Sequence, residues 1–251
     1  MAAVFDLSPA HWVLASLGAL SLGVAKAGFN GLSLFHVMVF ALLFGARDST
    51  GIVLPMLLIG DVLAIAAYRR QARWDYLRRM LPPACVGIIV AAAVMGRLSD
   101  AAFRPVIGWI ILVLCILQFI RMIWPDSFGD VPHGQAFAWG MGLLAGATTM
   151  LANAASPIMT IYFLAVALPK LAFVGTAAWF FFLVNAFKVP FSAGLGLIHP
   201  GTLMFNLLLS PAVIAGFVAG NWLIHRVPQQ LFDGVLMLFA AVAALRLIGA
   251  F

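Results

Sequence analysis

The sequence predicts an all-α polytopic membrane protein that is built from two homologous repeats. Three observations support this prediction: the composition, the length of the apolar runs, and a nearly constant spacing between similar motifs. The chain of 251 residues is 65% hydrophobic and 9% charged, whereas soluble domains carry about 25% charged residues. Its mean hydropathy is +1.11. A chain this apolar is expected to lie mostly within a lipid bilayer.

The apolar runs predict the transmembrane spans in order. A spanning helix needs about 20 apolar residues, and six runs meet this requirement: 49–68, 81–97, 102–123, 172–193, 203–224 and 230–249. Two longer runs, 10–44 and 136–168, are interrupted by AKAGFNG (25–31) and by TTMLANAASP (148–157). The pieces on either side of each interruption reach only the bilayer centre at about 1.5 Å per residue. Each longer run is therefore predicted to be a broken helical segment.

Similar motifs recur along the chain at a nearly constant distance. The matched pairs are Thr50 with Thr176, Pro83 with Pro211, and Phe103 with Phe232, at offsets of 126, 128 and 129 residues. This spacing indicates a gene duplication, with a first transmembrane repeat over 1–125 and a second over 126–251. Each repeat holds one broken segment and three full spans. Paired interrupted segments at matching positions point to the binding site of a transporter.

Positive charge predicts the orientation of the chain in the membrane. Five arginines lie in RRQARWDYLRR (69–79), so this loop is predicted to be cytoplasmic. If the broken segments are re-entrant hairpins, the repeats are inverted, with eight cations inside and four outside. If they cross the membrane, the repeats are parallel and the counts are seven and five. The inverted arrangement is favoured by this small margin. Because topology accounts for the basic loop, we expect no nucleic-acid partner.

Three ionisable residues lie deep inside apolar runs: Lys26, Asp61 and Lys188. Each costs about 2.5–3.5 kcal/mol at the centre of a membrane helix, so the group is a candidate functional site. Two structural alternatives stay open, because Lys188 lies close enough to the end of its span to snorkel and Asp61 can form a structural ion pair. Lys26 is the hardest to explain structurally, since it adjoins backbone that cannot be regular helix.

The two interruptions favour an anion site. Half-helices that begin at an interruption point free N–H groups and a positive dipole end into it, and such termini bind anions. A cation site would instead need carboxylates and carbonyls. The expected substrate-binding residues are Lys26, Gly28, Asn30, Gly31, Thr148, Thr149, Asn153, Ser156, Asn185 and Lys188. Asp61 is expected to neutralise the empty site or to carry a proton, and His36 is a weaker candidate for charge coupling. The aromatic run 179–182 is expected to face lipid or to pack, not to surround a ligand.

Several motifs resemble the sulfite exporter TauE/SafE family of anion transporters. They are KAGFNG at 26–31, LPMLLIGD at 54–61, LANAASP at 151–157 and NAFKVP at 185–190. The resemblance implies movement of sulfite, or of an organosulfonate such as sulfoacetate, across a bacterial inner membrane, usually as export. Many members carry G-x-G-G-G at the interruptions. The second interruption here has Ala154, Ala155 and Ser156 instead, which leaves the substrate open.

The predicted function is a secondary transporter of a small sulfur-containing anion. The chain has no G-x-x-x-x-G-K-[ST] motif, so transport would draw on gradients or on the membrane potential. It also lacks H-E-x-x-H and C-x-x-C-H, and we expect no enzyme activity, metal or cofactor. An anion channel, or an importer of a related oxyanion or carboxylate, stays as the alternative. The expected partners are the small anion and the lipid bilayer, and a homodimer is left open.

Overall fold

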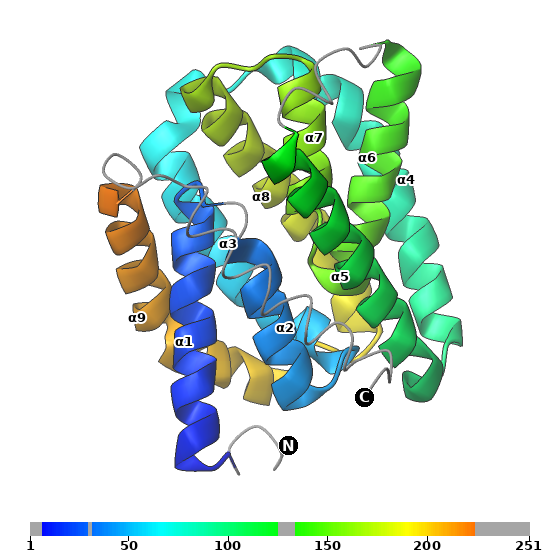
Figure 1. Ribbon diagram of the computed structural model, residues 1–251. Helices are drawn as coiled ribbons and strands as arrows, with labels where there is room; N and C mark the ends of the chain where they lie inside the picture. The colour runs from blue at the N-terminus through cyan, green and yellow to red at the C-terminus, as the bar shows by residue number, and fades with distance from the viewer. Residues whose placement is uncertain (1–6, 30–31, 125–133, 224–251) are drawn as a thin grey trace.

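The computed structural model describes residues 7–29, 32–124 and 134–223, and all regular structure in these ranges is helical. In chain order the helices are α1 (Pro9–Lys26), α2 (Ser33–Phe44), α3 (Asp48–Tyr68), the short η3 (Arg69–Gln71), α4 (Trp74–Arg97), α5 (Asp100–Ile123), α6 (Gln135–Ala152), α7 (Ser156–Ala165), α8 (Lys170–Gly194) and α9 (Pro200–Leu223) (Figure 1). The predicted span at 230–249 lies outside the described residues.

Four of the described helices are long and apolar enough to cross a membrane, as judged by length and composition: 48–71, 74–97, 171–194 and 200–223. Their outward faces stay apolar. On α9, for example, Leu207 is 65% exposed and Val218 is 61% exposed. Because such side chains gain by leaving water, these faces fit a lipid environment.

The basic segment 69–79 is not a single loop, as the sequence had predicted. Its first residues form η3, and α4 already begins at Trp74, before the predicted start of that span. Leu77 and Met80 explain the difference, because they are 1% and 0% exposed while Arg78 and Arg79 are exposed. This amphipathic turn gains enough by burial to extend the helix beyond the bilayer-length run.

The shorter helices pair with each other as antiparallel hairpins. In the first pair, Gly18 near the middle of α1 packs against Phe40 near the end of α2. In the second pair, the rings of Phe137 at the start of α6 and Tyr162 in α7 have centroids 5.8 Å apart. Figure 1 shows each pair lying side by side, with the connecting turn inside the helical bundle.

The two long helices α3 and α8 also run antiparallel. Gly51 near the start of α3 lies against Leu197, just beyond the end of α8. At the other end, Gly175 near the start of α8 lies against the backbone of Tyr68, the last residue of α3. This packing places the middle of α3 beside the middle of α8, close to the turns of both hairpins.

Two close crossings hold the hairpins to the remaining long helices. The most extensive packing in the described chain joins α4 to α6 and α1 to α9. Gly146 of α6 lies against the backbone of Ala84 in α4, and Gly216 of α9 lies against the backbone of Leu20 in α1. Small residues let helix backbones approach closely in membranes, so these glycines set the position of both hairpins.

We predict that Gly146→Ala destabilises the protein, because its Cβ would overlap the Ala84 backbone. Overpacking of this kind costs about 1–3 kcal/mol. Gly140→Ala is the matched control, since it lies on the same helix and an added Cβ meets nothing within 4 Å. Thermal unfolding in detergent should show a lower midpoint for the first variant and an equal or higher one for the control. Equal midpoints would contradict the assigned crossing.

Candidate functional site

The two hairpin turns are produced by local backbone chemistry. After Lys26, the last residue of α1, the chain passes through Gly28 at φ +121°, a conformation that favours glycine. After α6, Asn153 adopts the left-handed conformation at φ +53°, which asparagine tolerates better than most residues. The following helix α7 then begins at Ser156-Pro157, with proline in its first turn, where its missing N–H costs nothing.

The centre of the site is an ion pair between two hairpin and span residues. The Lys26 ammonium lies 2.5 Å from Oδ1 of Asp61 in α3, and Nδ2 of Asn185 in α8 donates to Oδ2 at 2.7 Å. Asp61 is 0% exposed. A buried carboxylate is stable only when it is paired and hydrogen-bonded, and here each of its oxygens has a partner. The Lys26 ammonium also lies 4.6 Å from the ring centroid of Phe181, a cation–π distance.

Lys188 forms a second buried cluster next to the first. Its ammonium donates to Oδ1 of Asn153 at 2.5 Å, to the hydroxyl of Thr149 at 3.2 Å and to Oδ1 of Asn185 at 3.3 Å. The residue is 1% exposed, so it does not snorkel to the interface. Asn185 therefore joins the two clusters, since its amide nitrogen bonds Asp61 and its amide oxygen accepts from Lys188.

Asn153 also ties the second hairpin turn to α3. Its Nδ2 donates to the backbone carbonyl of Thr50 at 2.9 Å, while its Oδ1 accepts from Lys188. The amide thus uses both of its ends. The result is that the turn between α6 and α7 is fixed against α3 on one side and against α8 on the other.

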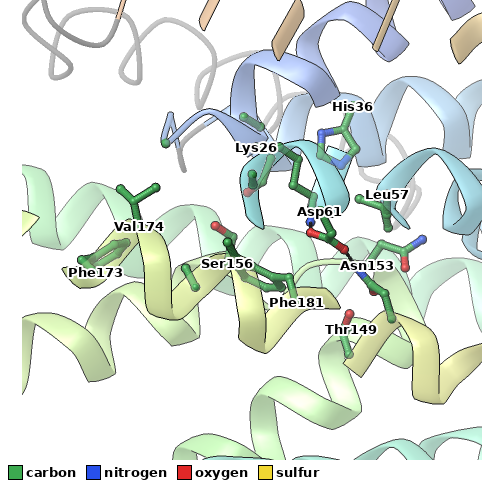
Figure 2. Close-up of a pocket in the computed structure, with 17 residues that line it drawn as sticks. Lys26, His36, Leu57, Asp61, Thr149, Asn153, Ser156, Phe173, Val174 and Phe181 are labelled. Carbon is green, nitrogen blue, oxygen red and sulfur yellow. Dashed lines mark hydrogen bonds and ion pairs between the residues drawn. The ribbon is translucent and has the colours of Figure 1, made fainter. Parts of the chain in front are cut away.

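A small cavity of about 50 Å³ adjoins these clusters. One water needs roughly 10–15 Å³ measured in this way, so the space suits a few water-sized groups. Its polar wall consists of Lys26, Ser33, His36, Asp61, Thr149, Asn153, Ser156 and Asn185. Figure 2 shows Phe173 and Val174 toward the opposite end from Thr149 and Asn153. The cavity therefore has a polar end and an apolar end.

Most of the residues predicted for the site meet at this cavity. Gly28 lines it together with the polar residues just named, and Lys188 is one hydrogen bond away through three lining residues. Thr148 is not part of the described wall, because its hydroxyl donates to the Leu144 carbonyl of its own helix at 2.8 Å. Asn30 and Gly31 lie outside the described residues.

The apolar wall was missed by the sequence analysis. Phe181 lines the cavity under the Lys26 ammonium, although the aromatic run 179–182 had been assigned to lipid or to packing. The helical period would have found it, because residues four apart share a helix face. Counting back from Asn185 by fours gives Phe181, Ala177 and Phe173, and each of them lines the cavity.

The charges of the site leave an excess of one positive charge. Two lysines and one aspartate form the clusters, so in formal charge the group is cationic. The first residues of α2 and α7, Ser33 and Ser156, also line the cavity, and helix N-termini carry partial positive charge. A cavity with this wall is suited to an anion.

Comparisons with known proteins identify the family of the chain. No curated protein and no solved structure matches it. A family profile described as Sulfite exporter TauE/SafE matches residues 14–247, which is nearly the whole chain and includes every residue of the cavity wall. The resemblance seen in the sequence motifs is therefore confirmed. Together with the apolar helices, the match shows that the chain is a multi-pass membrane protein and belongs to the sulfite exporter TauE/SafE family of transporters.

Proposed function

We propose that this protein is a secondary transporter that exports a small sulfur-containing anion, either sulfite or an organosulfonate such as sulfoacetate, across a bacterial inner membrane. The observation that carries the proposal is the buried group of two lysines and one aspartate beside a cavity at two hairpin turns. An anion in the cavity would neutralise the excess positive charge. An inside-negative potential would favour its exit by about 2.3 kcal/mol per charge per 100 mV.

We infer that the site forms between two inverted repeats. Lys26 and Asp61 are in contact across 35 residues of chain, and Asn153 and Lys188 are in contact across the same separation. The second pair lies 127 residues after the first, close to the offsets of the repeated motifs. The equivalent helices α3 and α8 run antiparallel, which supports inverted repeats over parallel ones.

The two hairpin turns differ in a way that supports alternating access. Asn153 in the second turn bonds the Thr50 carbonyl of α3. By the repeat offset, the counterpart of this contact would join Lys26 to α8 near Ala177, but Lys26 and Ala177 instead both line the cavity. We infer that the opposite state exchanges these arrangements, with the first turn packed on α8 and the second released from α3. In inverted repeats such an exchange moves access from one side of the membrane to the other.

The cavity extends toward the segment that is predicted to be cytoplasmic. Val174, in its apolar wall, packs in one apolar cluster with Tyr68, the residue that precedes the basic segment 69–79. Near the other end of α8, Gly51 and Leu197 pack closely together. The described state is therefore proposed to face the cytoplasm.

Flux measurements should test the carrier function directly. Proteoliposomes with the purified protein should take up sulfite or sulfoacetate with a rate that saturates, and unlabelled anion on the opposite side should accelerate exchange. A carrier saturates because each turnover needs one bound substrate and one conformational exchange. Flux that rises without limit and shows no counter-exchange would instead indicate a channel.

Removing the ion pair in two steps should separate folding from binding. Lys26→Met leaves the Asp61 carboxylate buried without its cation, which is expected to cost about 3–5 kcal/mol of stability. Adding Asp61→Asn removes the unpaired charge and should restore most of the unfolding midpoint. We expect neither variant to bind or transport the anion, because the excess positive charge is lost. Wild-type transport by the stable double variant would place the site elsewhere.

The inverted arrangement can be tested at two equivalent positions. Ala72 and His199 are 127 residues apart, so parallel repeats would place them on the same side of the membrane. After Cys85 and Cys115 are replaced by alanine, Ala72→Cys should react with an impermeant maleimide only in permeabilised cells. His199→Cys should react in intact cells. Labelling of both positions from the same side would contradict inverted repeats.

A further inference from the structure

His36 is buried in the cavity wall without a hydrogen-bond partner. It lies on α2 and is 2% exposed, and neither Nδ1 nor Nε2 is hydrogen-bonded to any of the described residues. The other polar groups of the wall are engaged. Asp61 bonds Lys26 and Asn185, and Asn153 bonds the Thr50 backbone. His36 thus stands apart from the satisfied network that surrounds it.

A buried imidazole in this condition requires a partner from the cavity. The ring always carries at least one N–H, and an unmade hydrogen bond of a buried polar group costs about 1–3 kcal/mol. The neighbouring side chains on α2 offer none, since Leu34, Val37 and Phe40 are apolar and at most 5% exposed. Figure 2 shows the His36 ring on the same side of the cavity as Lys26 and Asp61. The space into which the imidazole can donate is therefore the anion cavity.

We propose that His36 contacts the transported anion and donates an imidazole N–H to one of its oxygens. This inference rests on the proposed function. The charge of the same anion is balanced at Lys26, so the ligand must present at least two acceptor oxygens, one toward the ammonium and one toward the imidazole. His36 thereby selects oxyanions, because a site built to donate a hydrogen bond discriminates against ligands that lack the acceptor.

The alternative, a purely structural histidine, makes the opposite prediction for stability. A structural histidine would be held by hydrogen bonds whose loss destabilises the fold. In this position an apolar side chain of similar size would instead relieve an unsatisfied polar group among apolar neighbours. His36→Leu is therefore expected to leave the ligand-free protein as stable as the wild type or more stable, while it weakens binding. Such an opposition between stability and function is typical of binding sites.

The experiment compares three variants of the full-length protein. His36→Leu removes the donor, His36→Asn keeps a side-chain N–H, and His199→Leu removes an imidazole outside the cavity wall. Each is measured for saturable flux of sulfite and of methanesulfonate in proteoliposomes, and for the rise in unfolding temperature caused by each anion in detergent. Loss of a hydrogen bond to a charged group should raise the KM of His36→Leu by about tenfold or more. His36→Asn should recover most of this loss, and His199→Leu should keep the wild-type KM.

Each result either supports or overturns the assignment. A wild-type KM and a wild-type thermal shift in His36→Leu would overturn it. Failure of His36→Leu to fold, or a markedly lower ligand-free midpoint, would also overturn it, because a structural role would then account for the residue. If the wild-type protein itself shows neither flux nor a thermal shift with any sulfur anion, the proposed function fails. Normal wild-type behaviour with an unaffected His36→Leu would remove only the role of His36.

Discussion

The buried contact between Lys26 and Asp61 is the constraint on which the rest of the site depends. Neither charge is stable alone in an apolar interior, and the cost of leaving one unpaired exceeds the value of most other single contacts. The pair therefore fixes the end of α1 against the middle of α3. Asn185 bonds the second oxygen of Asp61 and brings α8 into the same network. One ion pair thus determines where a hairpin turn and two long helices meet.

The close helix crossings make this constraint geometrically attainable. Glycines such as Gly146 and Gly216 let α6 approach α4 and let α9 approach α1 at backbone distance. The hairpins are consequently held from outside by the long helices, while their turns contact α3 and α8 at the centre. Because the outer crossings are apolar and tight, movement is expected mainly at the polar turns, where hydrogen bonds can be exchanged.

The site combines satisfied and unsatisfied polar groups. Asp61, Asn185 and Lys188 are buried and fully engaged with one another or with Asn153 and Thr149, which gives a rigid cationic wall. His36, in contrast, lacks a partner among the described residues. A rigid wall lowers the cost of ordering a ligand, and an unsatisfied donor makes binding specific. The cation–π contact of Lys26 with Phe181 keeps the ammonium at the junction between the polar and apolar ends of the cavity.

The sequence by itself determined the membrane class, the family, most helix positions and the residues at which α1 and α6 end. These features depend on composition and on local backbone chemistry, such as Gly28 and Asn153 in conformations that end a helix. Only the tertiary structure decided that Lys26 pairs with Asp61, that Lys188 is buried, and that Phe181 lines the cavity. It also placed the start of α4 at Trp74. The reason is physical: these outcomes depend on contacts between residues far apart in the chain, such as Asp61 and Asn185 at a separation of 124 residues, and the local sequence does not specify which distant side chains will meet.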